Sequence, residues 1–178
     1  MVVTQNVTCT IDSTWADWCG GSSGAGLSVL PAGSLVLNGG FESDLANWTN
    51  ILPSMSTGIK TNVVYQATKS IGQGQTALDA NGYCGGFYQP VTGLQAGDTA
   101  TVSWALWSDG RAASGVGFSA FLGSIRLQPD PYVFQDQKWD YITCANVPAT
   151  SNSANIQFQF LQIPQYWYID AISVVMPN

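Results

Sequence analysis

Glu42 is the only glutamate in this chain of 178 residues, and it stands just after the glycine pair Gly39-Gly40. The apolar run Leu35–Leu37 before the pair is too short for a helix and predicts a strand. Paired glycines allow the positive φ angles of a tight turn, so we expect the chain to reverse direction there. A carboxylate that directly follows such a turn is a candidate ligand.

The other acids and the possible nucleophiles give no catalytic signature. The chain has no histidine, which removes Ser-His-Asp and Cys-His arrangements. Glycoside hydrolysis needs two carboxylic groups at a defined separation. None of the aspartates lies in a recognisable motif, and Glu42 belongs to the turn. Because Lys60, Lys69 and Lys138 also lack an activating motif, we expect a protein that is not an enzyme.

Flat aromatic rings and amide groups are suited to sugars, which present apolar C–H faces and rims of hydroxyl groups. Side chains alternate between the two faces of a strand. Trp107 is therefore expected on the face opposite Trp104, away from the core. By the same alternation, Gln157 and Gln159 oppose the apolar side chain of Phe158 and its neighbours. Trp107, Gln157 and Gln159 are the first candidates for contact with a ligand.

Other polar and aromatic residues extend this set of candidates. Tyr88 lies in a predicted strand, Tyr141 stands two residues before a threonine, and Arg111 lies in the loop after Trp107. A second aromatic platform is expected at one end of the domain, formed by the loop residues Tyr132, Tyr166 and Trp167.

The spacing of the apolar runs predicts an all-β domain. Short runs alternate with turns, and no stretch has helical periodicity. Strands are expected near Val63–Gln66, Thr76–Ala80, Gly86–Val91, Thr99–Trp107, Val116–Leu122, Trp139–Ala145, Asn155–Leu161 and Trp167–Val175. In an antiparallel sandwich, one face of each strand is apolar and the other is free. An alternative is that the outward aromatics only cover a sheet or meet a neighbouring subunit, while the core is filled by Trp104, Trp139, Phe118 and Phe158.

The segments LVLNGGFESDLANW, from Leu35 to Trp48, and YWYIDAISVV, near the C-terminus, carry the most specific motifs. They resemble the carbohydrate-binding modules of the CenC-like group (families 4, 9 and 22), which show N-G-x-F-E…W near one end and Y-I-D-x-V-S near the other. The turn Gly93-Leu-Gln-Ala-Gly-Asp98 adds to the similarity. The resemblance implies a jelly-roll antiparallel β-sandwich that binds polysaccharide without cleaving it, with Trp48 in a structural role.

The resemblance also implies a structural calcium ion (Ca2+), held by Glu42, Asp170 and backbone carbonyl groups. Calcium takes roughly six to eight oxygen ligands, so the carbonyl groups would have to supply several of them. The resemblance assigns residues 34–178 to a module-like domain. Residues 1–33 are then an added part with a strand, a small disulfide loop and a Gly/Ser link. The alternation in Val2–Ile11 predicts that strand, either as an edge strand or as an arm that pairs with another molecule.

Composition points to an extracellular protein. Charged residues make up only 9% of the chain, against about a quarter in ordinary soluble proteins. With a net charge of −6 and five basic residues, the chain has no electrostatic footprint for nucleic acid or an anionic membrane. No apolar run is long enough to span a bilayer. The sequons at Asn6 and Asn47 are candidate N-glycosylation sites.

Four cysteines allow three pairings. Cys9 and Cys19 would close a small loop, and Cys84 and Cys144 would join two strands, so this pairing is favoured. The cysteines show no Cys-x-x-Cys spacing and the chain has no histidine, which argues against zinc. Disulfides indicate an oxidising, secretory environment.

Two functional hypotheses follow. The first is a secreted, non-catalytic protein that binds a polysaccharide or another glycan through aromatic stacking and amide hydrogen bonds. The second is a structural subunit of an extracellular filament, a cell surface or a virion, which uses the same fold for adhesion or self-association through the N-terminal strand. Exposed strand edges favour such pairing.

Overall fold

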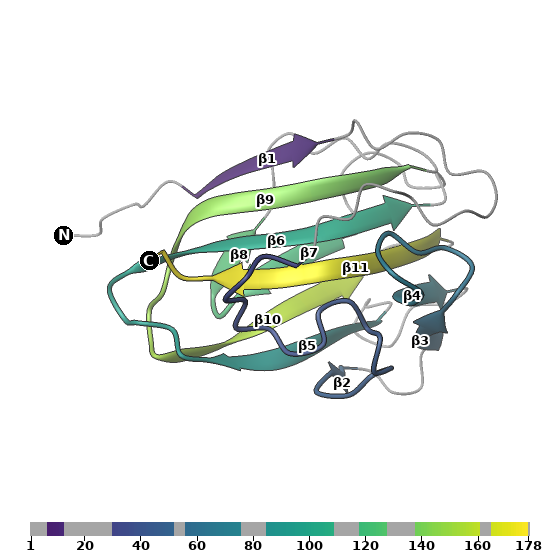
Figure 1. The fold of residues 1–178 in the computed structure, drawn as a ribbon, viewed down its shortest axis with the longest axis horizontal. Coiled ribbons are helices and arrows are strands. Elements are labelled where there is room, and N and C mark those ends of the chain that lie inside the picture. The colour runs from purple at the N-terminus through teal and green to yellow at the C-terminus, as the bar shows by residue number, and fades with distance from the viewer. Residues whose placement is uncertain are drawn as a thin grey trace.

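The computed structural model describes residues 7–12, 30–51, 56–75, 85–108, 118–127, 138–160 and 165–177. Within these ranges the chain forms strands and turns and no helix (Figure 1). The described part therefore holds no helix that could cross a membrane. The strands form two antiparallel sheets packed face to face, which confirms the predicted β-sandwich.

The first sheet has six strands in the order β1-β9-β6-β11-β4-β3. The long strands β9, β6 and β11 run side by side across the front of Figure 1, with β1 outside β9. The bounds are β1 (Thr8–Asp12), β9 (Trp139–Pro148), β6 (Thr99–Ser108), β11 (Gln165–Val175), β4 (Ser70–Gln75) and β3 (Ser56–Lys60).

The second sheet has five strands in the order β2-β5-β10-β7-β8. Neighbours in this order pair antiparallel throughout. The bounds are β2 (Thr49–Asn50), β5 (Gly85–Thr92), β10 (Ser153–Phe160), β7 (Phe118–Leu122) and β8 (Ile125–Leu127).

The core lies between the sheets and is built by side-chain alternation along the strands. In β6, Val102, Trp104 and Leu106 are buried against the second sheet. The ring of Trp104 meets Phe158 of β10 edge-on at a centroid distance of 5.7 Å, and Phe118 of β7 lies 6.3 Å away. Because large aromatic side chains dominate core energetics, this cluster fixes which face of each strand is left outside.

Six predicted strands are confirmed over the residues that the structure describes, namely β5, β6, β7, β9, β10 and β11. Four other strands have no counterpart among the predictions. Glycines at Gly58, Gly72 and Gly74 interrupt the apolar alternation of β3 and β4, and β2 and β8 are only two and three residues long. The predicted strand Thr76–Ala80 lies outside the described residues.

Two strand predictions are wrong, because Leu35–Leu37 and Val63–Gln66 form no strand. In the first segment, the side-chain amide of Gln89 accepts a hydrogen bond from the Leu37 N–H and donates one to the Leu37 carbonyl, both at 2.7 Å. This amide takes the place of a neighbouring strand. In the second segment, backbone N–H groups are bound by the carboxylate of Asp170. In both segments, a side chain from a distant part of the chain makes backbone hydrogen bonds that a neighbouring strand would make in a sheet.

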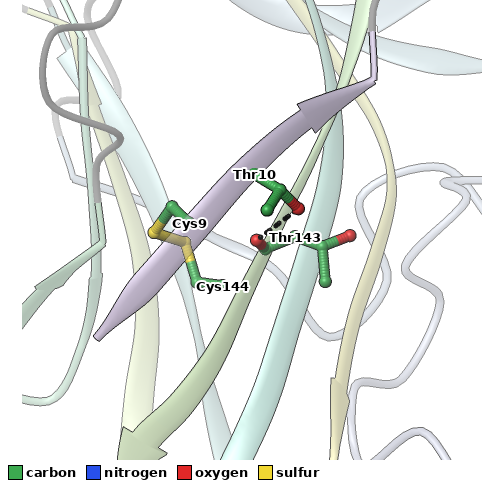
Figure 2. Close-up of a disulfide and its surroundings, with 4 residues drawn as sticks. All are labelled: Cys9, Thr10, Thr143 and Cys144. Atoms are coloured by element: carbon green, nitrogen blue, oxygen red, sulfur yellow. Dashed lines mark hydrogen bonds between the residues drawn. A yellow bond between two sulfur atoms is a disulfide. The ribbon is translucent and has the colours of Figure 1, made fainter. Parts of the chain in front are cut away.

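The described part of the predicted N-terminal strand, β1, is an edge strand of its own molecule. It pairs with β9 in a register that sets Cys9 opposite Cys144 and Thr10 opposite Thr143. The Thr10 hydroxyl donates to the Thr143 carbonyl at 3.4 Å (Figure 2). The apolar side of β1 packs against the sandwich core, as the alternation predicts.

A disulfide joins Cys9 to Cys144 across β1 and β9 (Figure 2). The predicted pairing of Cys9 with Cys19 and of Cys84 with Cys144 is therefore wrong. Closeness in sequence suggested a small loop, but strand pairing brings together two cysteines that are 135 residues apart. Cys19 and Cys84 lie outside the described residues.

Candidate functional site

A row of side chains crosses the outer face of the second sheet. Strand register sets Gln157 of β10 directly between Tyr88 of β5 and Phe121 of β7. The row continues to Thr49 of β2 on one side and Arg126 of β8 on the other. Tyr88, Gln157 and Phe121 are half-buried, whereas the end residues Thr49 and Arg126 are exposed. With a strand spacing of about 4.8 Å, the row is about 19 Å long.

The polar groups of this row are available to a ligand. Within the described part of the chain, the amides of Gln157 and Gln159 and the hydroxyl of Tyr88 make no hydrogen bond to other protein groups. Each amide offers both donors and an acceptor, and the rings of Tyr88 and Phe121 offer apolar surface on either side of Gln157. The face thus combines stacking surface with free hydrogen-bonding groups.

Sequence reasoning missed Phe121 and Arg126 as members of this face. Phe121 lies three positions after the core residue Phe118 on the same strand, so alternation would have placed it on the outer face. Arg126 gives no such signal, because β8 is too short to show a pattern. It extends the row only through its pairing with β7, and its guanidinium donates to the Ser119 hydroxyl at 3.3 Å.

Trp107 and Tyr141 lie on the opposite side of the molecule, on the outer face of the first sheet. As predicted, Trp107 is on the face opposite the buried Trp104. The expected surface that combines Trp107 with the two glutamines is not formed, since β6 and β10 belong to different sheets. Alternation assigns a face within one strand and says nothing about which sheet contains that strand.

Two other aromatic predictions are corrected. Trp139, which the alternative interpretation placed in the core, lies beside Trp107 on the outer face of the first sheet. Trp167, expected in a loop platform, is 1% exposed and packs in the core against Phe118 and Phe160, because it lies within β11. Outside the described part lie the other members of the predicted set, Arg111, Tyr132 and the side chain of Tyr166.

Glu42 and Asp170 bind one loop between them. Glu42 accepts hydrogen bonds from the backbone N–H and hydroxyl of Thr68, at 3.0 and 2.6 Å, and from the N–H of Lys69, at 2.8 Å. Asp170 accepts from the N–H groups of Tyr65 and Gln66, at 3.1 and 2.8 Å. These two carboxylates therefore fasten residues 65–69, here called the latch loop, to the sandwich.

The two carboxyl groups have opposite electrostatic environments. Burial alone would raise the pKa of Glu42, but hydrogen bonds from Thr68 and Lys69 and the charge of Lys69 hold it below its usual value. Burial dominates at Asp170 and raises its pKa to about 7, against the lowering effect of the N–H groups of Gln66, Ala171 and Tyr65. The pKa values of the two carboxyl groups are thus shifted in opposite directions.

The described residues around these carboxylates do not fit a calcium site. The latch loop already occupies both oxygens of Glu42, and the Lys69 ammonium contacts the Glu42 carbonyl at 3.2 Å and Asp44 at 2.7 Å. In the part of the chain that the structure describes, no three acidic, histidine or cysteine side chains are grouped so that they could hold a metal ion. Calcium needs roughly six to eight oxygens, and the described side chains here give it no support. The calcium ion is not tested by them and stays a prediction.

The glycine pair before Glu42 serves close packing. Positive φ angles were expected at Gly39-Gly40, but they occur at the flanking Asn38 and Phe41, at 54° and 56°. A Cβ atom on Gly39 would overlap the backbone carbonyl of Ile172, whose N–H donates to the Gly39 carbonyl at 3.0 Å. Gly39 is thus required by the approach of the turn to β11.

Gly39→Ala is expected to destabilise the fold by about 2–3 kcal/mol, because overpacking forces backbone shifts of that cost. Urea unfolding followed by circular dichroism measures the change. Gly58→Ala in β3 is the matched control, since its Cβ would meet open space and its φ is not positive. Equal losses in the two variants would contradict the packing argument.

Trp48 has the structural role that its motif position implies. It is 8% exposed, and its ring lies 5.4 Å from Phe41 and 5.2 Å from Phe87. Its indole N–H donates to the carbonyl of Asn38 at 3.1 Å, across the turn. Asn47, the sequon residue beside it, is exposed, and Asn6 lies outside the described residues. Glycosylation of either stays a prediction.

Comparison with solved structures identifies the fold. The chain aligns over 81% of its length with 99% of a family 61 carbohydrate-binding module in complex with β-1,4-galactotriose, at a TM-score of 0.59 and 12% identity. A family 4 module matches over 79% of this chain and 99% of its own, at 0.54 and 16%. The fold is similar to that of carbohydrate-binding modules.

The same fold also occurs in a larger viral protein. The enzymatically active domain of tailspike protein 4 from bacteriophage CBA120 aligns with 81% of this chain at a TM-score of 0.58 and 14% identity, but only 21% of the tailspike chain is covered. No protein family and no curated protein sequence matches the chain. The similarity is therefore one of fold, and the resemblance to the CenC-like group stays a prediction at the level of sequence.

Proposed function

We propose that this protein binds a glycan, without cleaving it, on the outer face of its second sheet. The observation that carries the proposal is the row in which the free amide of Gln157 lies between the rings of Tyr88 and Phe121. Sugar rings stack on aromatic faces while their hydroxyl groups bond to amides. The row of about 19 Å is long enough for several sugar units of an extended chain.

Two further observations support the proposal. The fold is similar to that of carbohydrate-binding modules, one of which was solved with β-1,4-galactotriose. The Cys9–Cys144 disulfide favours an oxidising compartment, which agrees with an extracellular protein that meets polysaccharides. We therefore take soluble β-1,4-galactan, mixed-linkage β-glucan and xylan as the three probes.

The rival hypothesis of self-association through the N-terminal strand receives less support. Residues Thr8–Asp12 of that strand are paired with β9 of the same molecule, and Cys9 is bonded covalently to it. Exchange of β1 between molecules would require this bond to break. The glycan-binding proposal makes no such demand.

Tyr88→Ala and Gln157→Ala are each expected to weaken binding of the recognised polysaccharide by about fivefold to thirtyfold, the loss typical of central contact residues. Affinity electrophoresis and isothermal titration calorimetry measure it. Thr101→Ala, an exposed position on the other sheet, is the matched control. If both variants bind as tightly as the wild type, or if none of the three probes binds, the proposed site is wrong.

A further inference from the structure

The strands of the second sheet differ in charge from the rest of the molecule. The chain has a net charge of −6, with eleven acidic and five basic residues. The strands β2, β5, β7, β8 and β10 contain no aspartate or glutamate, and their one charged residue is Arg126 of β8. Three strands of the first sheet, in contrast, each contain an aspartate, namely Asp12, Asp140 and Asp170. The strands that carry the proposed glycan-binding row thus have one positive charge and no negative one.

Arg126 leans over the outer face of this sheet. It is exposed and lies at one end of the row, opposite Phe121 of β7. Its guanidinium donates to the hydroxyl of Ser119, also in β7, at 3.3 Å. Ser119 is in turn directly opposite Gln159 of β10. The side chain therefore reaches from the edge strand β8 toward the centre of the sheet, where a ligand on the row can meet it.

Most of the hydrogen-bonding capacity of this guanidinium is unused. A guanidinium has five N–H donors in a planar fork, and the Ser119 hydroxyl is a neutral acceptor for one of its nitrogens. Among the described residues, Arg126 forms no ion pair, and the pair found there joins Lys69 to Asp44. The amide of Gln159 is likewise unbound within the described part of the chain. Both groups can therefore donate to an anion that arrives with the ligand.

The chemistry of these donors favours a carboxylate. Arginine matches the two oxygens of a carboxylate with two parallel N–H groups, which makes this charged hydrogen bond stronger than a neutral one. A carboxylate only accepts hydrogen bonds, and the Gln159 amide can supply a further donor. Because the strands of this sheet contain no acidic side chain, none of their residues repels such a group. Uronic acids are sugars that carry a carboxylate on the rim of the ring.

We propose that the glycan bound on this face contains uronic acid units and that Arg126 binds the carboxylate of one of them. The inference rests on the proposed function for the position of the sugar chain, and it adds the chemical class of the ligand. Tyr88, Gln157 and Phe121 contact the sugar rings, whereas Arg126 distinguishes an acidic unit from a neutral one at the end of the row. Neutral chains bind to the same row more weakly.

The inference is tested with two acidic polysaccharides, glucuronoxylan and polygalacturonan. Each is compared with its own carboxyl-reduced form, which keeps the backbone and loses the charge. Isothermal titration calorimetry is expected to show that at least one acidic polymer binds about threefold to tenfold more tightly than its reduced form, a difference between those of an exposed ion pair and a charge-assisted hydrogen bond. Added salt should reduce this preference, because it screens exposed charges.

Variants of Arg126 separate recognition of the anion from a merely structural role. Arg126→Gln should bind both forms of the polymer equally, with the affinity that the wild type has for the reduced form, and its melting temperature should change by about 2 °C or less. Arg126→Lys keeps the charge but not the planar fork, so part of the preference should remain. Lys60→Gln in β3 is the matched control, since it changes the net charge equally on the other sheet. It should keep the full preference.

The outcomes distinguish this inference from the proposed function. Equal affinity of the wild type for the acidic and reduced forms of both polymers, a lack of binding to all four, or an undiminished preference in Arg126→Gln would overturn the inference, while the neutral probes test the row separately. Binding that depends on Arg126 but is unaffected by Tyr88→Ala would overturn the row and support the acidic ligand. A sulfated glucan that binds as tightly through Arg126 would overturn the assignment to a carboxylate.

Discussion

Asp170→Ala is expected to lower the free energy of unfolding by about 3–6 kcal/mol, because three N–H groups, one buried and two part-buried, lose their acceptor at about 1–2 kcal/mol each, the lower part of the range for buried groups. These are the N–H groups of Tyr65, Gln66 and Ala171, at 3.1, 2.8 and 2.7 Å. Total stability of a domain is about 5–15 kcal/mol, so much of it would be lost. Urea unfolding followed by tryptophan fluorescence measures the change.

Asp170→Asn is the control for this prediction. It keeps one side-chain oxygen, which can accept from the N–H groups of Tyr65 and Gln66, but replaces the oxygen that accepts from Ala171 by an NH2 group and removes the charge. Burial raises the pKa of Asp170 to about 7, so the charged form is already disfavoured and its removal should cost little. We expect a loss well below that of Asp170→Ala. Equal losses would contradict the view that the N–H groups of the latch loop account for most of the effect.

The double variant Cys9→Ala/Cys144→Ala is expected to lose about 2–4 kcal/mol, the usual effect of removing a disulfide. The bond spans 135 residues and fixes the edge strand β1 to β9. Without it, the unfolded chain gains freedom, and β1 keeps only its backbone pairing and its apolar side. A fall of the melting temperature by about 5–15 °C should follow in a protein of this size.

Thr10→Ala serves as the matched control, since it removes only the 3.4 Å hydrogen bond from β1 to the Thr143 carbonyl. Its melting temperature should stay within about 1–2 °C of the wild type, because such exposed changes cost about 0.5 kcal/mol or less. Peptide mapping under non-reducing conditions provides an independent check. A peptide that links Cys9 to Cys19 would contradict the structure.

Alternation along single strands was predictable, and it assigned side chains to faces correctly. Trp104 and Trp107 lie on opposite faces of β6, and Gln157 lies opposite the buried Phe158. The reason is local, since a strand repeats every two residues. Trp139 was the exception, because the alternative interpretation placed it in the core, whereas it lies on the outer face with Tyr141, two residues later on the same strand.

The candidate site needed more than alternation. The sequence indicated that Tyr88, Gln157 and Trp107 face outward, but only strand pairing puts the first two side by side and the third on another sheet. Gly39 gives a second example. Its neighbours in sequence suggested a need for positive φ, whereas the backbone of β11, more than 130 residues away, explains the absence of a side chain.

By itself, then, the sequence determined an all-β sandwich, the outward face of its main strands and the absence of a histidine-based catalytic site. Only the tertiary structure decided that Cys9 bonds to Cys144, that Asp170 holds the latch loop and that the aromatic residues divide between two opposite faces. The period of a strand is a property of adjacent residues. Strand order, in contrast, depends on how the whole chain buries its apolar faces and pairs its backbone groups, which joins residues far apart in sequence.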